Sequence, residues 1–169
     1  MDDRALLRHF LASLAYRTQK ALRDAPPHFG SFVAAADVRA PSALVCHMTS
    51  VLGFARTFFV GGSYRPEPLP SLADEVSRFH QMLSDLGRHL ESGTPMLNGM
   101  TTSRLLQGPF ADAMTHAGQL AMLRRLAGSP VPPEDFSLAV ISADRLGADQ
   151  PAPVSPDRVW DEALPGWKP

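Results

Sequence analysis

Cysteine is almost missing from this chain, which holds only Cys46 among its 169 residues. One thiol excludes an intramolecular disulfide and a zinc site built from several cysteines, and it indicates a reducing compartment. An excess of either charge is also missing, since 16 Lys and Arg face 17 Asp and Glu. The net charge of −1 gives no long-range attraction to phosphate backbones or anionic lipids. The sequence therefore argues against nucleic-acid binding and membrane association.

Long apolar runs and familiar active-site motifs are lacking as well. No uninterrupted apolar stretch approaches the ~18 residues needed to span a bilayer. The N-terminal segment carries acids at positions 2 and 3 and charges within an apolar pattern, which favours an amphipathic helix over a signal peptide. There is no glycine-rich phosphate loop, nucleophile elbow or His-Glu-x-x-His motif. We expect a soluble, cytoplasmic protein.

Apolar residues recur at steps of three and four in four segments, a spacing that places them on one face of an α-helix. The predicted helices cover residues 3–23, 41–60, 71–91 and 101–128. Pro26 ends the first helix, Gly61 ends the second and Ser71 caps the third. The fourth is expected to bend at Gly108-Pro109. Four such helices with long connections predict an all-α fold, a four-helix bundle with crossover loops.

The last segment, residues 129–169, has a different composition. It holds eight of the sixteen prolines and only one short apolar run. We expect an extended, proline-rich tail that packs on the bundle of residues 1–128 as part of the same single domain. Trp160 and Trp167 are predicted to anchor it.

Three metal-capable side chains fall on the predicted inner faces. His47 occupies one position of an inward stripe on the second helix. The other positions of that stripe are Leu44, Val51, Phe54 or Ala55, and Phe58. Asp112 and His116 are four residues apart on the fourth helix, so their Cβ atoms lie on one face, roughly 6 Å apart.

The face that carries Asp112 and His116 also carries Leu105, Leu120 and Leu123, which are typical core residues. An unpaired carboxylate in such an interior costs several kcal/mol, so the acid requires a partner, and a metal ion is the most economical one. Two histidines and one carboxylate suit Ni(II), Zn(II), Fe(II) or Mn(II) and leave coordination positions open.

Structural alternatives exist for each of these residues. His47 is equally compatible with a core histidine bonded to a carbonyl, and Asp112 with a partner such as His116, Arg56 or Arg104. The remaining histidines are predicted at stripe edges or in a loop: His9, His28, His80 and His89. Cys46 is predicted to be a buried thiol that acts as a small hydrophobe.

The fourth helix carries the most specific pattern in the chain. Residues 112–120 read Asp-Ala-Met-Thr-His-Ala-Gly-Gln-Leu, and residues 123–128 read Leu-Arg-Arg-Leu-Ala-Gly. Together with His47 on the second helix, this pattern resembles the DinB/YfiT-like superfamily of four-helix-bundle, metal-dependent enzymes. That superfamily has a histidine on its second helix and a His-x-x-x-His pair followed by Gly-Gln on its fourth. The resemblance covers about residues 1–130 and differs in one ligand, because Asp112 replaces the first histidine of the pair.

The resemblance implies a metal held by His47, Asp112 and His116, with Gln119 bonding a ligand or shaping the pocket. It further implies a transferase that uses a low-molecular-weight thiol, or a hydrolase, acting on a small-molecule substrate. Arg56 and Arg104 are candidate contacts for an anionic substrate. Two alternatives remain open: a non-enzymatic metal-binding or stress-associated dimer, and a bundle with a vestigial site. A homodimer is expected.

Overall fold

The computed structural model describes residues 2–155, in which helices are the only regular elements. The long helices are α1 (Asp3–Leu22), α2 (Pro41–Val60), α3 (Leu72–Glu91) and α5 (Ala111–Leu126). The shorter elements are η1 (Phe29–Ser31), α4 (Thr102–Leu105), the π-helical η2 (Leu106–Phe110) and η3 (Phe136–Leu138). The prediction of an all-α fold is confirmed for this part of the chain.

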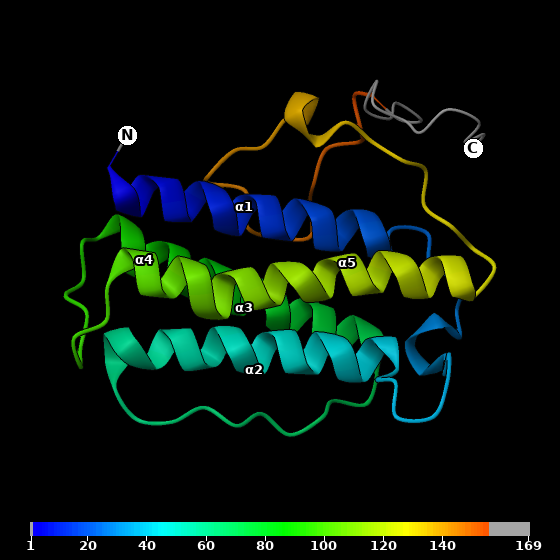
Figure 1. Ribbon diagram of the computed structural model, residues 1–169, viewed down its shortest axis with the longest axis horizontal. Coiled ribbons are helices and arrows are strands. Elements are labelled where there is room, and N and C mark those ends of the chain that lie inside the picture. Colours follow the sequence, from blue (N-terminus) through cyan, green and yellow to red (C-terminus); the bar gives the residue numbers. More distant parts are fainter. Residues whose placement is uncertain (1, 156–169) are drawn as a thin grey trace.

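The four long helices lie side by side and pack in the ring order α1, α3, α2, α5 (Figure 1). Each helix contributes fully buried apolar side chains to one common core. These side chains include Leu11, Leu14, Met48, Leu52, Phe79, Leu83 and Leu120. Because α2 and α5 are neighbours in this ring, residues of α2 can meet residues much later in the sequence.

Local sequence signals set the helix ends. The side chain of Ser71 accepts a hydrogen bond from the backbone N–H of Asp74, which is the predicted N-cap of α3. Pro41 occupies the first turn of α2, where its missing N–H has no partner to lose. The predicted bend also occurs, because Gly108 is non-helical and Pro109 follows it between α4 and α5.

The apolar face of α2 is displaced from the predicted stripe. Val45, Met48 and Leu52 are fully buried, whereas Phe54 is 54% exposed and His47 is only half-buried. Within the described residues, α2 is the helix that is long and apolar enough to cross a membrane, with half of its most apolar window buried. Its packing between α3 and α5 accounts for that composition.

Residues 129–155 form an irregular chain that crosses α1 and α3 (Figure 1). The Tyr16 hydroxyl donates to the buried carboxylate of Glu134 at 2.5 Å. Farther along, the Leu146 carbonyl lies 2.8 Å from His80 Nδ1 on α3. Trp160 and Trp167, the predicted anchors, lie outside the described residues.

Arg124, near the end of α5, joins three parts of the chain. Its buried guanidinium donates hydrogen bonds to the carbonyls of Ala21 and Arg23 at the end of α1, at 3.0 and 2.9 Å. The same group donates to the carbonyl of Ser129, at 2.9 Å. Carbonyl groups at the end of a helix lack a hydrogen-bond donor within that helix. The side chain of Arg124 therefore supplies donors both at the end of α1 and just after α5.

Candidate metal centre

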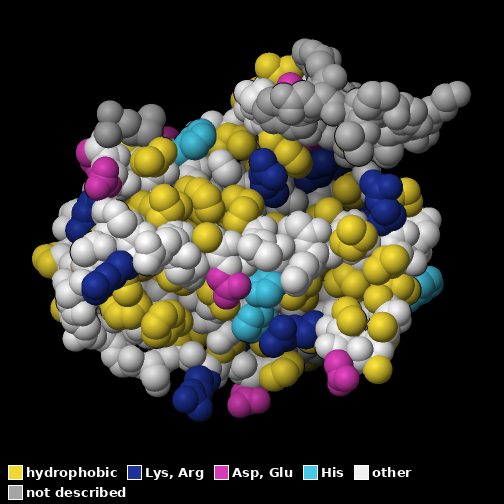
Figure 2. Space-filling view, in the orientation of Figure 1, with side chains coloured by type: hydrophobic (Ala, Val, Ile, Leu, Met, Phe, Trp, Pro, Cys, Tyr) yellow, Lys and Arg dark blue, Asp and Glu magenta, His cyan; other side chains and the backbone are white. Residues whose placement is uncertain are grey.

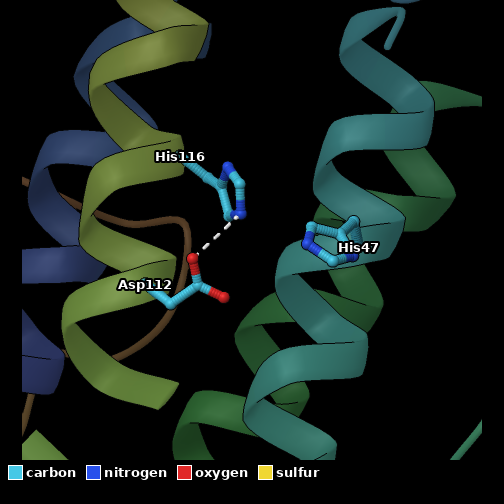
Figure 3. A group of neighbouring side chains, drawn as sticks. All are labelled: His47, Asp112 and His116. Carbon is cyan, nitrogen blue, oxygen red and sulfur yellow. Dashed lines mark ion pairs between the residues drawn. The ribbon is translucent and has the colours of Figure 1, made fainter. Parts of the chain in front are cut away.

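The three predicted ligands meet in the groove between α2 and α5. His47 projects from the middle of α2, and Asp112 and His116 project toward it from successive turns of α5 (Figure 3). One nitrogen or oxygen of each side chain lies within 4.8 Å of the others. The antiparallel packing of α2 on α5 therefore brings together residues that the sequence alone only places on separate helices.

The spacing of these atoms is close to what a common ion requires, but its upper limit is slightly wider. Ligand atoms that each lie about 2.0–2.2 Å from one metal are at most about 4.4 Å apart. His116 Nε2 is 3.4 Å from Asp112 Oδ1, and the His47 and His116 rings have centroids 4.8 Å apart at 74°. A shared ion would therefore require the three side chains to move slightly closer together.

His116 is oriented by a neighbour on its own helix. Its Nδ1 lies 2.8 Å from Oε1 of Gln119, an acceptor, so this contact favours the tautomer with the proton on Nδ1. Nε2 is buried and makes no hydrogen bond within the described residues; its 3.4 Å approach to Asp112 is an ion-pair distance only. A buried acceptor without a donor is what a metal ligand looks like before its ion is added.

The surroundings of His47 favour its neutral form. Burial lowers the pKa of His47, and the positive charges of Arg39 and of His116 when protonated lower it further, while Asp112 acts in the opposite direction. Since only neutral imidazole can bind a metal, this environment favours the ligand form.

Asp112 is more exposed than the sequence predicted. Its side chain is 50% exposed, whereas His116 is only 10% exposed, so the carboxylate lies at the mouth of the groove and not in an apolar interior. Leu120 and Leu123 of α5 are buried, but Asp112 lies to one side of them on the helix and is partly exposed to solvent. Burial alone therefore does not require a partner for this acid. The buried Nε2 of His116, which makes no hydrogen bond within the described residues, is the stronger evidence for a metal site.

Comparison of the whole chain with protein-family models, curated proteins and solved structures finds no match. The case for the centre thus depends on its own geometry.

Two hollows flank the centre along the same groove. One, of about 690 Å³, begins at Asp112 and reaches Phe54 and the bend at Pro109. The other, of about 470 Å³, begins at Gln119 and extends along α5 beneath the loop before α2. Figure 2 shows acidic, histidine and basic side chains together near the middle of this face, with hydrophobic side chains beside them. The centre is accessible from both sides.

The arginines predicted for an anionic substrate lie elsewhere. Arg56 bonds to Asp85 on α3, and Arg104 is exposed and donates to the carbonyl of Gly99. Neither lines a hollow beside the centre. Arg39 does, and sequence reasoning missed it because a loop residue has no periodicity to mark it.

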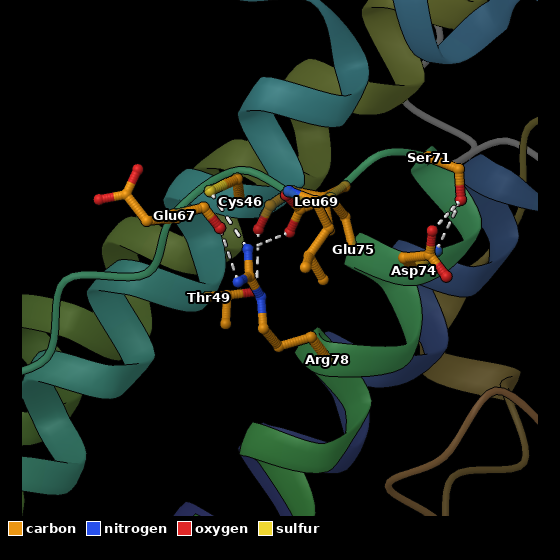
Figure 4. Close-up of polar contacts among 9 residues, drawn as sticks. Cys46, Thr49, Glu67, Leu69, Ser71, Asp74, Glu75 and Arg78 are labelled. Carbon is orange, nitrogen blue, oxygen red and sulfur yellow. Dashed lines mark hydrogen bonds and ion pairs between the residues drawn. The ribbon is translucent and has the colours of Figure 1, made fainter.

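Cys46 belongs to a different cluster, on the α3 side of α2 (Figure 4). Arg78 donates to its sulfur at 3.4 Å and to the buried Glu75 carboxylate at 2.5 Å. Arg78 also donates to the Glu67 carbonyl at 2.8 Å. Burial, followed by the charge of Glu75, raises the pKa of Cys46, so this thiol is not activated.

The other histidines play no part in the centre. His9 and His28 are exposed, and His89 stacks on Phe59 with ring centroids 5.2 Å apart. His80 was predicted at a stripe edge, but only 5% of it is exposed and it bonds to Leu146. A position at the stripe edge is compatible with this burial, because residues 129–155, which helical periodicity does not predict, cover that side of α3.

Proposed function

We propose that this protein binds a divalent transition metal through His47, Asp112 and His116. The observation that carries the proposal is the convergence of three ligand atoms within 4.8 Å, one of them a buried nitrogen without a hydrogen bond. The donor set of two imidazoles and a carboxylate is compatible with Ni, Zn, Fe or Mn. The resemblance to the DinB/YfiT-like four-helix bundles supports the same three positions.

We further propose a metal-dependent transferase that uses a small thiol, or a hydrolase, in a cytoplasmic homodimer. A bound divalent ion would lower the pKa of a thiol or water at an open coordination position. In that arrangement Gln119 orients His116, and the low pKa of His47 keeps its imidazole neutral. The half-exposed Asp112 leaves the centre accessible from the larger hollow.

A second candidate is a bundle in which Asp112 and His116 form a structural pair. Their 3.4 Å approach, one helical turn apart, supports it, because such pairs stabilise helices without any ion. This candidate predicts no stoichiometric metal. A non-enzymatic metal-binding dimer, by contrast, predicts stoichiometric metal without turnover.

The test is elemental analysis of untagged protein, both as purified and after reconstitution with Ni, Zn, Fe or Mn. The His47→Ala/His116→Ala double variant is compared with His9→Ala/His28→Ala, which removes two exposed histidines outside the centre. Circular dichroism checks that both variants keep their helices.

Near-stoichiometric metal in the parent and in the His9/His28 variant, with none in the His47/His116 variant, supports the centre. Absence of metal from the reconstituted parent overturns it and favours the structural pair. Equal loss in both double variants would point to adventitious surface binding. Screens for thiol transfer and hydrolysis then separate an enzyme from a metal-binding protein.

A further inference from the structure

The smaller hollow is lined by large apolar side chains that remain in solvent. Val38 in the loop before α2 is 43% exposed, and Met122 and Leu126 on α5 are 56% and 58% exposed. Leu44 and Leu123 form part of its wall. Exposed apolar residues that gather around one concavity, unlike scattered ones, mark a binding surface. Its volume of about 470 Å³ is that of a small-molecule site.

The polar end of this hollow is the end nearest the metal centre. Gln119, which bonds His116, lines it, and Leu126 lies about 10 Å farther along α5. The hollow therefore changes from polar to apolar along its length, starting at the proposed metal.

A positive charge accompanies the polar end. Arg39 lines the hollow, acts electrostatically on His47, and makes no hydrogen bond or ion pair within residues 2–155. Asp37 also lines the hollow, but it is not among the charges that act on His47. A divalent ion with one carboxylate and two neutral imidazoles would leave one further positive charge beside Arg39.

We propose that this hollow binds a small amphipathic anion, with its apolar body between Val38, Met122 and Leu126 and its carboxylate at Arg39. The proposal names the substrate class of the same centre and so rests on the proposed function. An anion is favoured over a cation by the charges at the polar end. A small molecule is favoured over a protein surface by the size of the hollow.

The experiment titrates octanoate and its neutral analogue octanamide into the full chain, metal-free and zinc-loaded. Calorimetry gives the dissociation constants, and backbone amide shifts locate the ligand. Arg39→Gln removes the charge, and Arg104→Gln is the matched control, an exposed arginine outside the hollow. Leu126→Asn changes the apolar end at an exposed position, which leaves folding intact.

The expected result is octanoate binding that shifts amides in residues 34–39 and 119–126. Arg39→Gln weakens octanoate about tenfold and octanamide less than twofold. Leu126→Asn weakens both probes, and Arg104→Gln changes neither. Amide shifts elsewhere, or equal effects of Arg39→Gln on both probes, would overturn the proposal. So would a Leu126→Asn variant that changes only the oligomeric state, since a second copy would then cover the hollow.

The two proposals fail in different ways. If no metal binds but octanoate binding still depends on Arg39, the hollow is a ligand site and the metal centre is wrong. If metal binds stoichiometrically and Arg39→Gln has no effect on octanoate, the centre stands and this substrate class is wrong.

Discussion

Gln119 shows how a neighbouring side chain can orient a candidate ligand, His116. By accepting a hydrogen bond from Nδ1 of His116, it favours the tautomer in which the unprotonated Nε2 faces Asp112. The interaction is local, because both residues lie on one face of α5. It is therefore the part of the centre that sequence spacing predicts best.

Replacing Gln119 by Leu should weaken metal binding by about 10- to 100-fold while the fold is kept. The side chain is exposed, so the change removes one hydrogen bond and little packing. Competition with a chromophoric chelator measures the affinity. Gln81→Leu, at an exposed position on α3, is the control, and equal affinities in both variants would show that Gln119 does not orient the ligand.

His80 should make the stability of the protein depend on pH. Burial lowers its pKa in the folded state, and the hydrogen bond to the Leu146 carbonyl opposes that shift only in part. The unfolded chain, with a pKa near 6.5, then binds more protons, so the free energy of unfolding falls as the pH drops below about 6.5.

His80→Asn keeps an amide donor near the Leu146 carbonyl and removes the titration. Urea unfolding between pH 5 and 7.5 should give a smaller slope for the variant, with a difference of up to about 1.4 kcal/mol per pH unit. His47 titrates in both proteins and cancels in the comparison. Identical slopes would mean that His80 keeps an ordinary pKa when folded.

At the scale of elements, two helical glycines have opposite surroundings. A Cβ added to Gly53 on α2 would overlap the Tyr64 ring, whereas a Cβ added to Gly118 on α5 would meet nothing within 4 Å. Gly53 therefore permits the chain after α2 to fold back on that helix. Gly118 serves no such purpose and only weakens its helix.

We predict that Gly53→Ala destabilises the protein by about 1–3 kcal/mol, because the Tyr64 ring must move. Gly118→Ala should stabilise it by about 0.5–1 kcal/mol, since alanine is the better helix former. Chemical denaturation of the two variants measures both values. Destabilisation by Gly118→Ala would reveal a close approach to that backbone which the described residues do not have.

The ends of the helices could be predicted from the sequence, but not which face of α2 is buried in the core. Proline, glycine and serine mark the ends by local chemistry that packing does not change. In α2, by contrast, apolar residues occur on nearly every side, so Leu52 and Ala55 compete with Val51 and Phe54 for the core. Leu52 is buried in place of Val51, and of the two predicted alternatives Ala55 is buried and Phe54 exposed, so His47 is only half-buried.

The loop before α2 was beyond prediction for a different reason. Nothing local determines where residues 34–39 lie relative to α5, so neither Arg39 nor the hollow beneath it could be expected. The three ligands were predicted as candidates from periodicity and resemblance. Their convergence required the helix packing that only the structure provides.

At the scale of the whole molecule, Arg124 should be a centre of stability. Arg124→Met leaves the carbonyls of Ala21, Arg23 and Ser129 without their donor, and we expect a loss of about 2–4 kcal/mol. Arg125→Met, at the exposed neighbouring position, should change stability by less than about 0.5 kcal/mol. Thermal and urea unfolding measure the free energy of unfolding of both variants. Comparable values for the two would show that Arg124 does not stabilise the fold in this way.

The origin of the ligands on α2 and α5 has a consequence for how the protein matures. A nascent chain that has left the ribosome only as far as α3 carries His47 but neither of its partners. Even the finished chain presents the full set only after α5 has docked against α2. If the protein binds the proposed metal, capture would follow folding, so metal scarcity during growth would leave a folded protein that a later supply of the ion could fill without new synthesis.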